Sequence, residues 1–208
     1  MKHQIIESKE GSVIILDDVY SQNTYNTILN QVLGLVQLGK IEDHDVVGTA
    51  TTTVNSSNYL SHRKGLWIDD FFAENRHDFI YFAEHSNTIK KLTSDIKSLP
   101  FVFRGIEVTN WDESLLGVYS NNDGYRPHKD NCFYSSIFFL HDEKKFSGGD
   151  LIFDDMNINI EFIKNRLVLF PSWARHGVSK VVYPENYKPK FNEFRMSITT
   201  FYQINYHK

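Results

Sequence analysis

The sequence has little of what disulfide-stabilised, membrane-embedded or secreted proteins need. It has one cysteine, Cys132, among 208 residues, which excludes an intramolecular disulfide and a zinc site built from several cysteines. No run of about 18 apolar residues occurs, and the first residues lack the apolar core of a secretion signal. We therefore expect a soluble, cytoplasmic protein with no membrane contact.

An excess of positive charge is also absent. The chain has 22 Lys and Arg against 26 Asp and Glu, a formal net charge of −4. Because nucleic-acid binding needs clustered cations, and the sequence has no such cluster, we expect no nucleic-acid partner. Hydrophobic residues make up 41% and aromatic residues 14%, which excludes intrinsic disorder and provides material for one core. Nine histidines remain to be explained.

The first hundred residues show mainly helical patterns. Residues 13–16 are typical of a short strand, and apolar residues after Ser21 recur at helical spacing as far as Gly39. A second helical stretch is predicted over 69–97, with a break near 85–87.

Two further features complete this first part of the chain. Pro100 is expected to end the second helical stretch. Residues 43–66 are polar and rich in β-branched side chains, which indicates a strand pair with a mobile loop.

The second half changes character, because short β-rich segments follow one another without intervening helices. This order predicts a mainly β, α+β protein with a double-stranded β-helix (jelly roll) rather than a parallel sheet. We expect one domain over 1–208: residues 1–100 supply a strand and helices outside one sheet, and 101–208 form the jelly-roll core with the site. The predicted strands are 101–108, 115–119, 135–140, 150–153, 158–163, 166–170, 178–182 and 194–202.

A His-x-Asp pair lies in this second half, at His128 and Asp130. Residues two apart on an extended strand point to the same face, so an imidazole and a carboxylate can meet at one point. Two histidines and one carboxylate with open positions form the iron site of non-haem oxygenases. A third ligand must come from elsewhere, and His176 follows an apolar strand and a proline-containing turn.

A second pattern lies near the C-terminus. Arg195, Ser197, Thr199 and Phe201 share one face of a strand by the same two-residue period. A buried arginine needs an anion, and Ser197 is placed to hydrogen-bond the same carboxylate.

In this order, residues 115–202 resemble the 2-oxoglutarate- and Fe(II)-dependent dioxygenases, and within them the prolyl 4-hydroxylase-like branch. The elements that carry the resemblance are Tyr119 nine residues before His-x-Asp, Phe138-Phe139-Leu140, the segment 146–153, Leu169-Phe170-Pro171 before His176, and Arg-x-Ser-x-Thr.

The resemblance implies a role for each matching residue. His128, Asp130 and His176 would bind Fe(II), and Arg195 would pair with the distal carboxylate of 2-oxoglutarate, so that these four form the catalytic centre. The other implied contacts to the cosubstrate are a hydroxyl from Tyr119, hydrogen bonds from Ser197 and Thr199, and pocket walls at Leu151 and Phe201.

The resemblance also implies the reaction. 2-Oxoglutarate is decarboxylated to succinate and CO₂ while O₂ supplies the oxygen placed in a C–H bond, with ascorbate as a candidate reductant. Asp130 favours hydroxylation, since family members that halogenate lack this carboxylate. Collagen-type enzymes usually carry Lys where Arg195 stands, whereas oxygen-sensing and many bacterial members carry Arg, and the two cations are not equivalent.

The substrate assignment stays open at this point. A prolyl residue in a peptide or protein is favoured by the branch resemblance, and a free amino acid or other small metabolite is the alternative. A metal-binding jelly roll without turnover is a third hypothesis, against which Arg195 and Tyr119 argue. Residues 61–68 resemble the loop that closes over the peptide in prolyl hydroxylases, so 48–68 is a candidate lid with Arg63 as a candidate contact, although an ordinary loop is the stronger interpretation of this short match. The other candidate substrate contacts, each as compatible with plain packing or solvation, are Tyr125, Arg126 and Trp173.

Two rival sites are weaker. His141 and Glu143 form a His-x-Glu pair, but the lysines that follow indicate a solvated turn. The second rival is a serine-hydrolase site with Ser172 as its nucleophile, but Ser172 lacks the flanking glycines typical of such a nucleophile.

Overall fold

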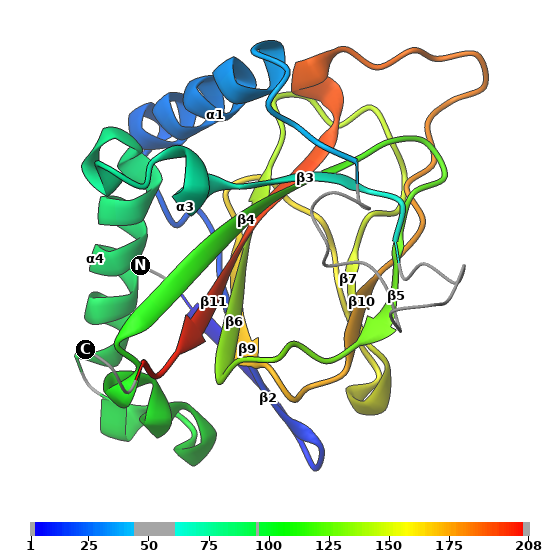
Figure 1. The fold of residues 1–208 in the computed structure, drawn as a ribbon. Helices are drawn as coiled ribbons and strands as arrows, with labels where there is room; N and C mark the ends of the chain where they lie inside the picture. Colours follow the sequence, from blue (N-terminus) through cyan, green and yellow to red (C-terminus); the bar gives the residue numbers. More distant parts are fainter. Residues whose placement is uncertain (1–2, 44–60, 95, 206–208) are drawn as a thin grey trace, which may run out of the picture.

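The computed structural model describes residues 3–43, 61–94 and 96–205, which form two facing antiparallel sheets (Figure 1). The larger sheet has the strand order β1-β2-β9-β6-β11-β4-β3, and the smaller has the order β5-β10-β7-β8. The predicted jelly roll is therefore confirmed. The strands of the larger sheet are β1 His3–Ser8, β2 Gly11–Leu16, β3 Lys64–Trp67, β4 Trp111–Tyr119, β6 Tyr134–Leu140, β9 Leu167–Pro171 and β11 Arg195–Gln203. Those of the smaller are β5 Tyr125–His128, β7 Leu151–Phe153, β8 Ile158–Ile160 and β10 His176–Val178.

The helices cover the outer face of the larger sheet, as predicted (Figure 1). They are α1 Gln22–Gln37, the short α3 Ile68–Phe71 and α4 Ile80–Thr93, joined by 3₁₀ turns at Arg76–Asp78 and Ile96–Ser98. In α1, Ser21 caps the first turn by accepting a hydrogen bond from the backbone N–H of Thr24, and the expected end near Gly39 is confirmed. No helix in the described ranges is long and apolar enough to cross a membrane.

Successive side chains of the larger sheet point to opposite faces, and this alternation divides the core into two layers. On β2, Ile14 and Leu16 pack under the helices, whereas Val13 and Ile15 face the smaller sheet. Because both faces of the larger sheet are covered, its central strands β6, β9 and β11 are almost continuously buried. The same alternation on β6 and β11 sends one set of side chains toward the helices and the other between the sheets.

Three predictions about local structure are wrong. The helix α4 runs through 85–87 without a break, because His85 is buried against the sheet while Ser86 and Asn87 are exposed, where poor helix formers cost little. The interruption comes earlier, before Ile80. Residues 101–108 form a 3₁₀ helix instead of a strand, because Phe103 and Ile106 are buried three positions apart.

The predicted strand at 178–182 is instead β10 at His176–Val178. Most of the candidate lid, residues 48–60, lies outside the described residues. The rest of it includes β3, which pairs with β4, and an isolated bridge between Ser61 and Tyr125.

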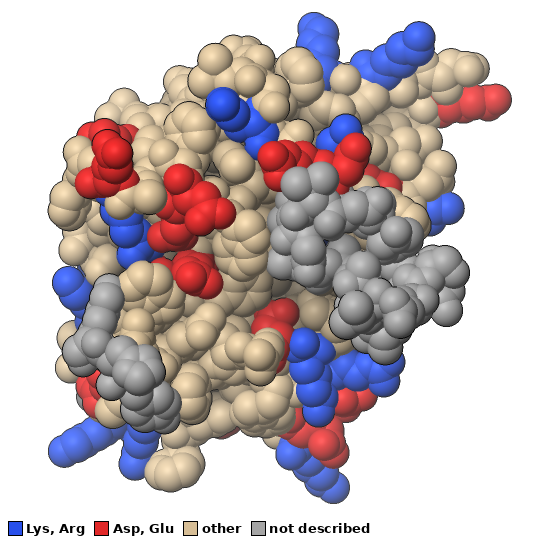
Figure 2. Space-filling model, viewed as in Figure 1, with Lys and Arg blue, Asp and Glu red and all other residues tan. Residues whose placement is uncertain are grey.

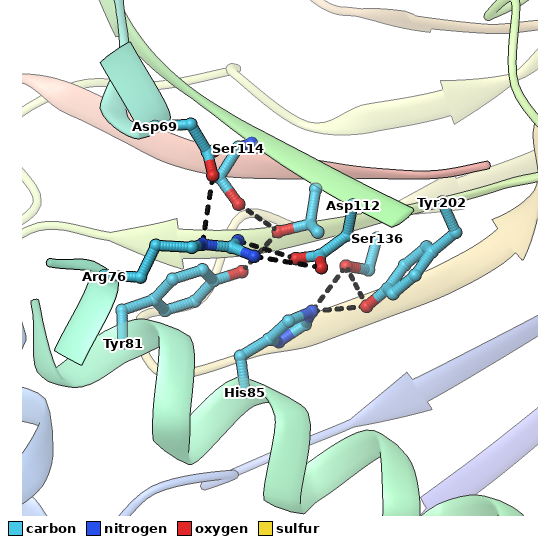
Figure 3. A network of polar contacts seen from close by, with 9 residues as sticks. Asp69, Arg76, Tyr81, His85, Asp112, Ser114, Ser136 and Tyr202 are labelled. Carbon is cyan, nitrogen blue, oxygen red and sulfur yellow. Dashed lines mark hydrogen bonds and ion pairs between the residues drawn. The ribbon is translucent and has the colours of Figure 1, made fainter. Parts of the chain in front are cut away.

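A buried polar network joins α4 to the outer face of the larger sheet (Figure 3). The Tyr81 hydroxyl lies 3.0 Å from Thr200 Oγ1, and His85 Nε2 contacts the hydroxyls of Tyr202 and Ser136. Burial lowers the pKa of His85 to about 4, so this imidazole is neutral at physiological pH. At one end of the network, the Arg76 guanidinium binds both carboxylate oxygens of Asp112 at 3.2 and 2.8 Å and also pairs with Asp69.

The aromatic cluster under the helices gives a first prediction. Phe138 is fully buried and contacts the rings of Tyr20, Tyr25 and Tyr81. Phe138→Ala should lower the free energy of unfolding by about 3–5 kcal/mol, since it leaves a cavity. The matched control is Phe101→Ala, where the ring is 80% exposed and the expected change is within about 0.5 kcal/mol. Equal losses in chemical unfolding of the two variants would contradict this packing.

Candidate active site

A cavity of about 350 Å³ lies between the two sheets. One wall is the inner face of β4 and β11, and the other is formed by the ends of β5 and β10. Over the face of the molecule in Figure 2, the described Lys and Arg side chains are interspersed with Asp and Glu. The cavity is lined by Arg63, Trp67, Glu113, Leu115, Gly117, Tyr119, Tyr125, His128, Lys129, Asp130, Asn131, Cys132, Ile137, His176, Val178, Arg195, Ser197, Thr199, Phe201 and Gln203.

The structure brings His128, Asp130 and His176 together in this cavity. His176 lies directly opposite His128 in the antiparallel pairing of β10 with β5. Asp130 Oδ1 is 3.4 Å from His128 Nε2, and Asp130 Oδ2 is 3.5 Å from His176 Nε2. One ligand atom from each residue lies within 4.8 Å of the others, so the three residues could hold one metal ion.

Hydrogen bonds fix which nitrogen of each histidine faces the cluster. His128 Nδ1 lies 2.9 Å from the carbonyl oxygen of Arg126, and His176 Nδ1 lies 3.0 Å from that of Ala174. A carbonyl only accepts, so each Nδ1 carries the proton. Both Nε2 atoms therefore present lone pairs toward Asp130, the tautomer that metal ligation needs.

The surroundings set the charges of these groups. Burial lowers the pKa of His176 and keeps its imidazole neutral. Burial alone would raise the pKa of Asp130, but its close pairing with His128 and His176 and the hydrogen bond that it accepts from Ser135 outweigh burial, and the pKa of Asp130 lies below its usual range. An ionised carboxylate beside a neutral imidazole is the state in which both groups can bind a cation.

Close packing holds the two imidazoles in place. The Tyr125 ring stacks on His128 with the ring centroids 3.9 Å apart, and the Phe170 ring lies edge-on to His176 at 4.6 Å. The backbones of β5 and β10 approach so closely at Gly177 that an added Cβ would lie 2.7 Å from the carbonyl oxygen of Tyr125.

Arg195 lies on the opposite wall and is fully buried. Its Nε donates to the carbonyl oxygen of Gly149 at 3.1 Å, and its Nη1 donates to Ser197 Oγ at 2.8 Å. Its Nη2 is buried without a hydrogen-bond partner among the described residues. Burial lowers the pKa of Arg195 to about 10, which still leaves the guanidinium charged at neutral pH. The group is therefore a cation with a donor left for an anionic ligand.

The other predicted cosubstrate residues are placed differently from one another. Tyr119 is paired with Arg195 in the register of β4 and β11, and its ring lies 4.4 Å from the guanidinium carbon. Thr199 and Phe201 line the cavity on the same strand face as Arg195. Leu151 is instead fully buried in the core between the sheets and is not among the lining residues.

The candidate substrate residues divide into two pairs. Arg63 and Tyr125 line the cavity, with the Arg63 guanidinium carbon 5.3 Å from the Tyr125 ring. Arg126 is exposed outside the cavity. Trp173 is half-exposed, and its ring packs against Gly11 at the turn between β1 and β2.

Three lining or adjacent polar residues were not predicted as functional. Ser135 donates a hydrogen bond to Asp130 Oδ2 at 2.6 Å, and Ser172 and Cys132 lie next to it. The two-residue period of β6 places Ser135 on the inner face with Ile137, so the sequence did carry a signal for it. The rival histidine, His141, is buried beside Phe162 rather than in a solvated turn.

The comparisons with known proteins agree with this geometry. Residues 115–203 match the model of the 2OG-Fe(II) oxygenase superfamily. No curated protein sequence matches the chain. This match covers the segment that carries the predicted resemblance, which is therefore confirmed.

Solved structures of several prolyl hydroxylases share this fold. A prolyl-4-hydroxylase from Pseudomonas putida aligns with a TM-score of 0.65 and 15% identity over 95% of this chain and 94% of its own. A prolyl hydroxylase from Trichoplax adhaerens, in complex with a hypoxia inducible factor peptide fragment, aligns at 0.66 and 18% over 94% and 84%. A viral collagen prolyl hydroxylase from Paramecium Bursaria Chlorella virus-1 aligns at 0.59 and 10% over 93% and 96%.

The residues present fit the groups that this superfamily uses. Two imidazole Nε2 atoms and one carboxylate suit Fe(II). The unpartnered donor on the buried Arg195 suits a carboxylate such as that of 2-oxoglutarate.

The close approach at Gly177 gives a second prediction. Gly177→Ala should push β5 from β10, lower the free energy of unfolding by about 1–3 kcal/mol and weaken metal binding, because the two imidazoles separate. The control is Gly34→Ala on α1, where nothing lies within 4 Å of an added Cβ. That change should be neutral or stabilising by up to ~1 kcal/mol. Chemical unfolding and Co(II) titration of both variants measure the difference, and identical behaviour would refute it.

Proposed function

We propose that this protein is an Fe(II)- and 2-oxoglutarate-dependent hydroxylase that acts on a prolyl residue of a peptide or protein. The observation that carries the proposal is the pairing, in one cavity, of the His128, Asp130 and His176 cluster with the fully buried Arg195. A metal cluster alone would also suit a sensor that only binds a ligand. A second, separate anion site in the same cavity is what a carboxylate cosubstrate requires.

In this proposal each wall of the cavity has its own task. His128, Asp130 and His176 would hold the metal, which with its cosubstrate would supply the oxidation: 2-oxoglutarate yields succinate and CO₂, and O₂ provides one oxygen atom to succinate and one to the hydroxylated product. Arg195 binds the distal carboxylate of 2-oxoglutarate through Nη2, and Tyr119 supplies a hydroxyl from the neighbouring strand.

The chain keeps this site preorganised. Ser197 holds the guanidinium through Nη1, so Arg195 is oriented before a ligand arrives. Thr199 is the next position on the same face and adds a polar group to the wall. Because Arg195 is already dehydrated, a carboxylate binding it gains a charge-assisted hydrogen bond in a site of low dielectric constant.

The preference for a peptide rests on the fold, because the Trichoplax neighbour was solved with a peptide fragment. Arg63 and Tyr125 are the proposed substrate contacts, since both line the cavity beside His128. Arg126 and Trp173 lie outside the cavity, so we leave them out of the proposed site.

One observation favours the alternative substrate class. Arg63 places a second guanidinium, only 5% exposed, in the cavity. A buried cation of this kind suits the free carboxylate of an amino acid or another small metabolite.

Turnover supplies a third prediction. With Fe(II), 2-oxoglutarate and O₂, the protein should form succinate, and His176→Ala should abolish this product because it removes a metal ligand. Ascorbate is proposed to sustain the activity, which parallel assays with and without it would measure. If no succinate forms with any substrate tested, both enzyme hypotheses are refuted, and the result supports a protein that only binds a ligand.

Mass spectrometry distinguishes the two substrate classes in the same assay. A proline-containing peptide that gains one oxygen atom supports the peptide substrate, whereas a gain confined to free amino acids supports the alternative.

The anchor gives a fourth prediction. Arg195→Lys keeps the positive charge but loses the planar set of N–H donors of the guanidinium group. The affinity for 2-oxoglutarate should therefore fall about 10- to 100-fold, as expected for the loss of a hydrogen bond to a charged group. The control is Arg126→Lys, an exposed position outside the cavity. Calorimetric titration with 2-oxoglutarate in the presence of Co(II) measures both. An unchanged affinity for the Arg195 variant would show that the anchor is elsewhere.

A further inference from the structure

We propose that Ser135, supported by Ser172, is the positioning residue that orients the Asp130 carboxylate for the metal. This inference rests on the proposed function, because it concerns the same metal cluster.

Asp130 needs such support because it lies beyond the end of β5. The strand ends at His128, so no ladder of strand hydrogen bonds fixes the Asp130 backbone. Its N–H donates instead to the carbonyl oxygen of Ser172 at 3.0 Å, and the N–H of Ser172 donates to that of Phe133 at 3.1 Å. The backbone of Asp130 is therefore fixed by the turn that follows β9, and its side chain requires a separate contact.

Ser135 makes that contact from the inner face of β6. Its hydroxyl donates to Asp130 Oδ2 at 2.6 Å, a short distance typical of a hydrogen bond to a carboxylate. Ser135 is fully buried on a central strand, paired on one side with β9 and on the other with β11. The donor is thus held on a strand that is paired along both edges.

Ser172 fixes the direction of this hydrogen bond. Ser135 has one hydroxyl proton, and an ionised carboxylate can only accept, so that proton belongs to Asp130. The oxygen of Ser135 then accepts from Ser172 Oγ, which lies 2.8 Å away and is also fully buried. The Cys132 sulfur lies 2.8 Å from Ser172 Oγ and 3.4 Å from Ser135 Oγ, and its thiol donates to the carbonyl oxygen of Tyr134 at 3.3 Å. Successive donors polarise one another, which strengthens the last bond to Asp130.

The consequence is that the two oxygens of Asp130 become inequivalent. Oδ2 accepts the Ser135 proton, whereas Oδ1 faces His128 Nε2 without that donor. Oδ1 is therefore the oxygen left for the metal, and a carboxylate that binds through one oxygen keeps positions open for the cosubstrate and O₂.

Ser136 is the matched control because it is the next residue on β6 and is also fully buried. Its hydroxyl points to the opposite face, where it joins His85 and Tyr202 in the network of Figure 3. Loss of this hydroxyl should affect stability without reaching Asp130.

The experiment is a titration of the full-length protein with Co(II), followed by its visible absorption, for the wild type and for Ser135→Ala, Ser172→Ala and Ser136→Ala. Ser135→Ala should bind Co(II) about 10- to 100-fold more weakly, the usual effect of removing a hydrogen bond to a ligand. Ser172→Ala should lose affinity in the same direction but less, and Ser136→Ala should bind as the wild type does. Thermal unfolding reports whether each variant is folded.

The outcomes separate this inference from the proposed function. If the wild type binds no Co(II), the metal site itself is refuted and the inference with it. If the wild type binds and Ser135→Ala binds equally well, the positioning role alone is refuted. If Ser135→Ala unfolds, the result for Ser172→Ala decides: weaker binding supports the relay, and unchanged binding overturns it.

Discussion

The alternation of side chains along β11 is the constraint on which the rest of the structure depends. This strand is paired on both edges, with β4 and with β6, and both of its faces are covered. Odd-numbered residues from Arg195 to Phe201 point into the cavity, whereas Met196, Ile198 and Thr200 point toward the helices. One strand therefore supplies both the anion site and the floor of the helical layer. A shift in register by one residue would exchange the two, so the helices and the site depend on the same pairing.

Arg195 shows how the protein holds an isolated charge. A buried guanidinium without an acidic partner is costly, and here it is met by one carbonyl, one hydroxyl and the aromatic faces of Tyr119, Phe139 and Phe162. These groups satisfy part of its hydrogen-bonding capacity, and within the described part of the chain Nη2 has no hydrogen-bond partner. A ligand can accept the hydrogen bond that Nη2 still has to donate. The folded protein is therefore less stable without the ligand, and the ligand binds more tightly.

Much of the site could be predicted from the sequence because the two-residue repeat of a β-strand determines which side chains share a face. The two-residue repeat placed Arg195, Ser197, Thr199 and Phe201 on one face, and the structure has them on one cavity wall. The helix from Ser21 to Gly39 also followed from its apolar spacing and its cap.

The remaining features depend on contacts that no local pattern contains. The contact between Ser135 and Asp130 can be predicted only if the neighbouring strands are known. Trp173 lies outside the cavity with its ring beside Gly11 at the turn between β1 and β2, a contact between segments far apart in the sequence. The helix break was misplaced because tertiary burial of His85 overrides the weak helix propensity of Ser86 and Asn87.

The pairing of β5 with β10 has a consequence for how the protein assembles. These strands are among the shortest in the fold, and the contact between His128 and His176 closes the long loop formed by the segment between them. Contacts distant in sequence close late, since the chain entropy of the intervening loop opposes them. The three ligand residues therefore come together only when the smaller sheet is complete. A metal ion that binds them would stabilise the fully folded chain relative to partly folded states.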